Sequence, residues 1–213
     1  MKHSSIRVIH EEHASLIAVL RSMNLMVERG PEDRPEVFFD LLRAMLFYMD
    51  EFPEKQHQLK EDELLFPAVA ARSAVARELI DKLAGARALG RRKIQELQQQ
   101  LPAWEMLGDS RRPLFEANLR SYVEFCVDHI QLEEKIVIPE ALRVLKEADW
   151  LQLDANFGNQ GEPVGGRYPR EPLYDRLYAR IAMHSPASLG LGRYHSDWTA
   201  FSPLQSAAHG MRA

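Results

Sequence analysis

Several features are scarce in this sequence of 213 residues, and each scarcity argues against a class of protein. A single cysteine, Cys126, excludes an internal disulfide and any zinc site built from several cysteines. No apolar run approaches the roughly 18 residues of a membrane-spanning helix, so we expect no membrane insertion. The net charge of -4 comes from interspersed acidic and basic residues, and no basic stretch indicates a nucleic-acid partner.

The beginning of the chain also lacks the pattern of a secretory signal. Acidic residues appear by Glu11, before any long apolar stretch, so we expect no signal peptide and a cytoplasmic location. Hydrophobic residues make up 46% of the chain and charged residues 27%, which is typical of a globular protein rather than a disordered one.

The apolar residues follow the three- and four-residue spacing of α-helices. The first helix is expected to begin with Ser4 or Ser5 as its N-cap and to end at Gly30 and Pro31. The other three helices are expected over residues 36–66, over 75–101, and from 113 into the 140s. Proline disrupts a helix interior, so the second helix, over 36–66, should be kinked or interrupted at Pro53.

Four amphipathic helices with short connections predict an all-α, up-down-up-down four-helix bundle over residues 1–150. The composition changes in the extension over residues 151–213, where 156–172 is rich in glycine and proline and is expected to be a linker. A short helix at about 173–183 is expected to dock on the bundle, and the residues from Ser185 should form a tail. The docking side chains would be Leu173, Leu177 and Ile181.

Histidine and glutamate occupy inward positions on three of the helices. His13 lies on the apolar face of the first helix, and the pairs His57/Glu61 and His129/Glu133 are each four residues apart, so that both members of a pair can reach one point. A single inward histidine is usually a hydrogen-bonded core residue. Buried carboxylates are costly without a cation, however, so the repeated pair predicts a metal site. Imidazole and carboxylate ligands without sulfur favour iron or manganese over structural zinc.

Heptad spacing predicts which neighbours share the face of these histidines. His129 falls on one line with Tyr122 and Ile136, and Leu64 lies one heptad after His57. On this basis all of them should face the interior of the bundle.

These residues lie in segments that resemble the hemerythrin HHE cation-binding family. The segments keep the family's order and spacing over roughly residues 5–145. They are Ile-His-Glu-Glu-His at 9–13, Phe-Pro-Glu-Lys-Gln-His-Gln-Leu-Lys-Glu at 52–61 with Leu-Phe-Pro at 65–67, and His-Ile-Gln-Leu-Glu-Glu at 129–134 with Pro139.

The resemblance implies a four-helix bundle around an oxo- or hydroxo-bridged di-iron centre. It also implies a protein that binds or senses oxygen, nitric oxide or iron. His10, one turn before His13, is a possible additional ligand or a neighbour of the ligands. By residue match, the metal ligands would be His13, His57, Glu61, His129 and Glu133, with the two glutamates bridging or capping.

One position departs from the family pattern. The family normally supplies a histidine from the third helix, but this helix has none, and Arg87 falls at the ligand position on one heptad line with Ile80 and Ile94. Gln58 likewise stands where many relatives have a second histidine. A guanidinium cannot ligate a metal and repels a nearby cation.

Five candidate ligands are few for two irons, so two alternatives to a di-iron centre stay open. The first is a mononuclear site, or one completed by water or by His10. The second is a metal-free bundle in which Arg87 pairs with Glu61 or Glu133 and the protein acts as an interaction or scaffold module.

No enzymatic activity is expected. Ferritin-like oxidases carry a Glu-x-x-His motif on two helices. Only Glu54 and His57 have this spacing here, because Cys126 occupies the corresponding place before His129.

Overall fold

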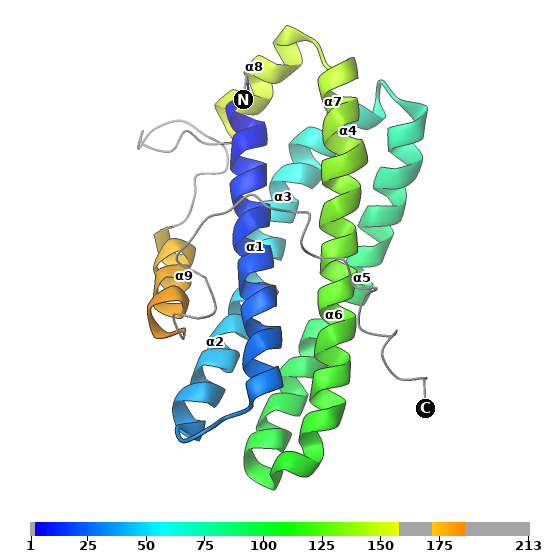
Figure 1. The fold of residues 1–213 in the computed structure, drawn as a ribbon. Helices are drawn as coiled ribbons and strands as arrows, with labels where there is room; N and C mark the ends of the chain where they lie inside the picture. Colours follow the sequence, from blue (N-terminus) through cyan, green and yellow to red (C-terminus); the bar gives the residue numbers. More distant parts are fainter. Residues whose placement is uncertain (1–2, 158–171, 186–213) are drawn as a thin grey trace, which may run out of the picture.

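The computed structural model describes residues 3–157 and 172–185, and this part of the chain contains helices and no strand. Four helical columns form the predicted up-down-up-down bundle (Figure 1). The first column is α1 (Ser4–Arg29) and the third is α5 (Ala74–Leu107). The second column contains α2 (Pro35–Phe52), a π-helical turn (Pro53–His57), α3 (Gln58–Lys60), a second π-helical turn (Glu61–Leu65) and α4 (Phe66–Ala70). The fourth contains α6 (Arg112–Leu132), a π-helical turn (Glu133–Val137) and α7 (Ile138–Val144), after a single 3₁₀ turn (Asp109–Arg111).

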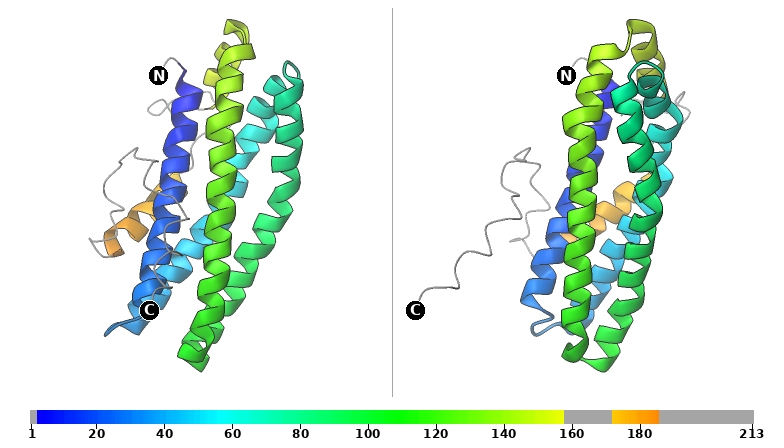
Figure 2. Two further views of the ribbon diagram at one scale, coloured as in Figure 1. Left: turned by 45° about the vertical axis from the view of Figure 1, so that its right-hand side comes forward. Right: turned by 90° about the vertical axis from the view of Figure 1, so that its right-hand side faces the viewer.

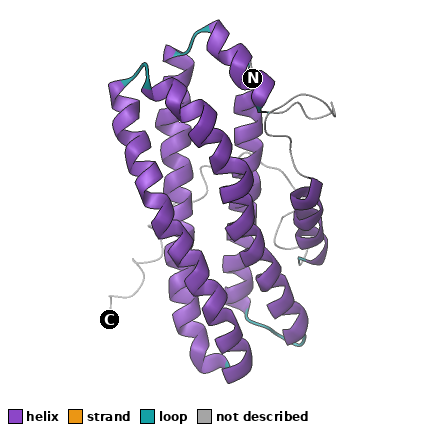
Figure 3. Cartoon of the chain, turned by 180° about the vertical axis from the view of Figure 1, so that it is seen from behind, coloured by secondary structure: helices purple, strands orange, loops and turns teal. Residues whose placement is uncertain are grey.

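The four columns enclose one interior, because α1 and α5 each contact both α2 and α6 (Figure 2). Short connections, such as residues 71–73, join successive columns (Figure 3). No helix in the described ranges has both the length and the apolar character needed to cross a membrane.

The interior consists of two apolar clusters separated by a polar layer. On α1 the cluster containing Ile9 gives way to the one containing Leu16, and His13 lies between them. On α5 the same change occurs between Ile80 and Ile94. The apolar clusters therefore close off the polar layer from both ends of the bundle.

Three π-helical turns explain where the heptad prediction fails. A π turn contains one residue more than an α turn, so it advances every later side chain by one position. In the fourth column Ile136 is 39% exposed and Val137 is fully buried; in the second column Leu65 is buried and Leu64 only partly so. The prediction that Ile136 faces the interior is therefore wrong. Leu64 is half-buried and packs against the core, so its prediction holds only in part, and Tyr122, which precedes the π turn, is buried as predicted.

Prolines accompany all three π turns. Pro53 begins the first, and Pro67 and Pro139 each lie two residues after the end of the others. Proline has no amide hydrogen and cannot bond the carbonyl four residues earlier, and for Pro67 and Pro139 that carbonyl lies in the preceding π turn. At Pro53, where the sequence predicts a kink or an interruption, the structure has a π turn and the column continues.

The N-terminus of α1 is capped by a distant residue. The N-cap position belongs to His3, which makes no side-chain cap bond, so the prediction of Ser4 or Ser5 is wrong. Helix α8 (Glu147–Asn156) lies at this end of the bundle, and its Asp154 accepts hydrogen bonds from the Ser5 amide at 2.8 Å and the Ser5 hydroxyl at 2.5 Å. The carboxylate satisfies a backbone donor that the helix itself leaves free.

Asp154→Ala is expected to lower the free energy of unfolding by about 1 kcal/mol, which is typical for the loss of a helix cap. Chemical denaturation followed by circular dichroism measures this change. Asp81→Ala, which removes an exposed carboxylate on α5, is the control and should leave stability nearly unchanged. Equal effects of the two substitutions would contradict a capping role for Asp154.

Helix α9 (Pro172–His184) docks on α2, outside the four columns (Figure 1). Ile181 is buried and Leu177 packs partly buried against the core, but Leu173 is 55% exposed, so its predicted docking is wrong. Tyr174 takes that role through ring contacts with Phe52. Most of the linker and tail predicted in the extension lies outside the described residues.

Candidate metal centre

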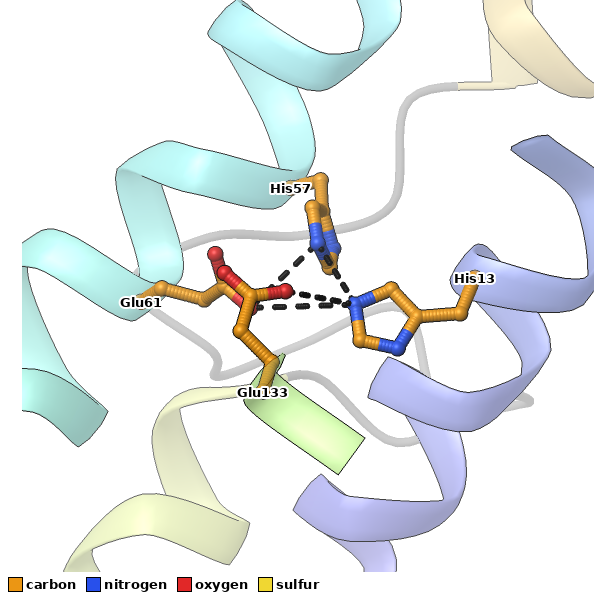
Figure 4. Close-up of side chains that lie close together, drawn as sticks. All are labelled: His13, His57, Glu61 and Glu133. Carbon is orange, nitrogen blue, oxygen red and sulfur yellow. Dashed lines mark hydrogen bonds and ion pairs between the residues drawn. The ribbon is translucent and has the colours of Figure 1, made fainter. Parts of the chain in front are cut away.

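Four buried side chains meet in the polar layer (Figure 4). His13 from α1, His57 and Glu61 from the second column, and Glu133 from the fourth each place one potential ligand atom within 4.8 Å of all the others. His13 Nε2 lies 3.0 Å from His57 Nε2 and 3.2 Å from Glu133 Oε2, and His57 Nε2 lies 3.3 Å from Glu61 Oε1. Four of the five predicted ligands therefore converge on one point.

The π-helical turns lie at the ligand positions. His57 ends the first of these turns, Glu61 begins the second and Glu133 begins the third. Such turns are frequent at functional sites, since the extra residue rotates a side chain away from its ordinary helical direction. The prolines that accompany these turns thus help to place the ligands.

Each of the two histidines is oriented by a second carboxylate. His57 Nδ1 lies 3.0 Å from Glu12 Oε2, and His13 Nδ1 lies 2.6 Å from Glu134 Oε1. When Nδ1–H donates to a carboxylate, the lone pair of Nε2 is left facing the centre, as is usual for metal-bound histidines. The sequence did not predict these roles of Glu12 and Glu134. Their only signal was that each is adjacent to a predicted ligand.

Glu12 also contacts a buried cation. Lys60 Nζ donates to Glu12 Oε1, and Lys60 is only 2% exposed. Burial would raise the pKa of Glu12, but the hydrogen bond with His57 and the charge of Lys60 outweigh it and hold the pKa below its usual value. Glu12 is therefore a carboxylate that neutralises the charge of Lys60 and also orients the imidazole ring of His57.

The remaining predicted histidines lie at the edge of this cluster. His129 Nε2 is 3.0 Å from Glu133 Oε1 but is outside the group of four convergent ligands. His10 Nδ1 contacts both carboxylate oxygens of Glu134, at 2.8 and 2.7 Å. His10 thus supports the partner of His13 and offers no atom to the convergent group.

The buried charges perturb one another strongly. Burial and the charge of Glu133 raise the pKa of Glu61 well above its usual value. Burial would also raise the pKa of Glu133, but the nearby imidazoles of His129 and His13 lower it. For His13, burial would lower the pKa, yet Glu133 and Glu134 raise it to about 10. Without a cation, Glu61 and His13 are therefore expected to keep their protons to a higher pH than free glutamate and histidine do.

The metal-free protein is expected to lose stability as the pH rises from 6.5 to about 10. A histidine with a raised folded-state pKa stabilises the fold fully below its unfolded pKa, and this contribution disappears as the pH passes the folded value. The raised pKa of Glu61 acts in the same direction. Melting curves of chelated protein across this interval measure the effect, and His13→Gln should flatten it. A melting temperature that rises with pH would contradict the assignment.

Arg87 lies against the centre, as the sequence predicted. Its side chain is 8% exposed, Nη2 is 3.3 Å from Glu61 Oε2, and Nη1 donates to Asp62. The guanidinium also lies over the ring of Phe66, 5.5 Å from its centroid. Of the two glutamates considered, the structure pairs Arg87 with Glu61.

A cavity of about 70 Å³ adjoins the cluster. Burial raises the pKa of its lining thiol, Cys126, to about 12, and this residue is not part of the convergent ligand group. Within the described residues, several buried polar atoms at the cavity have no hydrogen-bond partner, although some are in close contact. They are Nε of Arg87, Nε2 of His129 and both carboxylate oxygens of Glu133. Buried acceptors left without donors fit a bound cation.

Comparison with known families agrees with this geometry. The sequence profile described as the hemerythrin HHE cation binding domain matches residues 4–141, well over half of the chain. The matched segment contains His13, His57, Glu61 and Glu133 and all four columns except the last three residues of α7. No curated protein matches the chain.

Proposed function

The chain belongs to the family of hemerythrin HHE cation-binding domains, and we propose that it holds non-haem iron and binds or senses a small ligand. The observation that carries the proposal is the convergence of two imidazole Nε2 atoms and two glutamate oxygens, with both Nδ1 atoms held by carboxylates. The candidate ligands are oxygen, nitric oxide and iron itself. We propose binding or sensing rather than catalysis.

The donor set supports iron. Imidazole and carboxylate without sulfur suit iron or manganese, and the convergent group contains no cysteine. Iron bound here would supply a redox-active Lewis acid with a position open to a small ligand. Burial of the four side chains keeps bulk water away from that position, which strengthens electrostatic interactions within it.

The cavity supports a ligand of only a few atoms. It lies beside His57, His129 and Glu133, and its volume of about 70 Å³ suits a small molecule. Phe125 narrows it from one side: a Cβ atom at Gly90 would lie 2.8 Å from the Phe125 ring, so the ring can approach α5 only because this residue is glycine.

Metal analysis of protein purified without chelators tests the proposal. We expect iron in the natural chain and its loss in His13→Ala, since this substitution removes a central ligand. His184→Ala is a matched control, because His184 is exposed on α9. Absence of iron after growth in iron-supplemented medium, with the fold intact by circular dichroism, would contradict the proposal.

A metal-free scaffold is the second candidate, and the contact between Arg87 and Glu61 favours it. An arginine can balance one buried carboxylate without any metal. In that case neither iron nor manganese would copurify or bind on titration, and His13→Ala would alter stability alone.

A further inference from the structure

We infer that this centre binds one metal ion, and that the guanidinium of Arg87 takes the place of a second cation. The inference rests on the proposed function and specifies the stoichiometry and the charge balance of the same site. Its basis is the way in which the two buried glutamates divide their oxygens.

One subsite has a complete set of donors. Glu61 Oε1 and Glu133 Oε2 face the Nε2 atoms of His13 and His57 (Figure 4). His13 Nε2 lies 3.0 Å from His57 Nε2, 3.2 Å from Glu133 Oε2 and 3.9 Å from Glu61 Oε1, which is 3.3 Å from His57 Nε2. A cation among them would have four protein ligands, two neutral and two negative. These four side chains are almost fully buried, so protein atoms surround the subsite.

The other oxygens of the same glutamates face a second, adjacent group. Glu133 Oε1 lies 3.0 Å from His129 Nε2, and Glu61 Oε2 lies 3.3 Å from Arg87 Nη2. Both carboxylates are therefore shared between two subsites. In the second subsite the partner of Glu133 is the His129 imidazole, whereas the partner of Glu61 is the guanidinium of Arg87, which is already a cation.

Arg87 is fixed in this position from three sides. Asp62 accepts from Nη1, Glu61 lies beside Nη2, and the Phe66 ring lies below the guanidinium. A guanidinium stays protonated at any ordinary pH and has no lone pair to give a metal. It therefore holds positive charge permanently beside the second subsite.

Charge balance leads to the same conclusion. The centre contains two buried carboxylates, and Arg87 already compensates for part of the charge of Glu61. A first divalent cation and Arg87 together already balance the two glutamates. Even with Glu134 and Asp62 counted, four carboxylates would face Arg87 and two divalent cations, which together carry five positive charges. Uncompensated buried charge is strongly unfavourable.

Titration of the full chain with Fe²⁺ under anaerobic conditions, followed by desalting and metal analysis, tests the inference. We expect one equivalent in the natural chain and in Arg87→Lys, which keeps the charge. Arg87→Gln, which removes the charge, and Arg87→His, which adds a ligand, should each bind a second equivalent. Arg92→Gln makes the same charge change at an exposed position of α5 and should stay at one equivalent. Circular dichroism establishes that each variant is folded.

Each outcome bears on a different claim. Two equivalents in the natural chain would overturn the inference and leave the proposed function intact, whereas no bound metal would overturn both. One equivalent in the natural chain and in all folded Arg87 variants would show that Arg87 does not exclude the second metal. Since Arg87→Gln and Arg87→His are independent substitutions, failure of one to fold leaves the other to decide.

Discussion

Glu12→Ala is expected to lower the free energy of unfolding by about 3–5 kcal/mol, because it leaves the buried ammonium of Lys60 without its counter-ion. The glutamate side chain is buried between Lys60 and His57, so water cannot replace the lost carboxylate. The same substitution frees Nδ1 of His57. Loss of such a partner typically lowers metal affinity by about 10–100-fold.

Denaturation and metal titration of the same variant separate these two effects. Glu96→Ala removes an exposed carboxylate from α5 and serves as the control. The double variant Glu12→Gln/Lys60→Met should recover much of the stability, because it removes both buried charges and keeps an acceptor for His57. A single variant as stable as the control would show that Lys60 finds another partner or loses its charge.

Removal of the metal is expected to lower the melting temperature by about 8–16 °C. A ligand present at 1,000 times its dissociation constant stabilises the fold by about 4 kcal/mol, and in a chain of this size each kcal/mol corresponds to about 2–4 °C. The physical reason is that His13, His57 and Glu133 come from three separate columns and meet only in the folded state.

Melting curves recorded before and after chelation measure this change, with metal content determined on the same samples. In His13→Ala the chelator should have little effect, because the site is already lost. An unchanged melting temperature after demonstrated loss of metal would show that hydrogen bonds and ion pairs among the buried side chains, including Arg87, stabilise the polar layer without a metal.

The sequence determined the helical architecture because amphipathic spacing reports directly on burial. Ile80, Arg87 and Ile94 share one heptad line, and all three are buried on α5, as predicted. His13 is fully buried on α1 for the same reason. These predictions hold because α1 and α5 have no π-helical turn, so a constant period relates every position along them to one face.

The heptad spacing failed to predict the buried positions where the helices contain π turns. After Glu133 the buried position shifts from Ile136 to Val137, because the π turn adds a residue that composition does not reveal. A proline begins or follows each of these turns and is the sign of the widening in the sequence. Whether a proline produces a kink, a break or a π turn depends on how the neighbouring columns satisfy the freed carbonyls, and that is a tertiary property.

The sequence by itself determined an all-α four-column bundle and the histidines and glutamates of its polar layer, since both follow from local periodicity. Only the tertiary structure decided which carboxylate serves which imidazole. Glu12 pairs with His57 across 45 positions of the chain, and Glu134 pairs with His13 across 121. It also decided that Arg87 lies on Glu61 and not on Glu133. Such contacts depend on the distances between packed helices, whereas helical spacing relates only residues on the same helix.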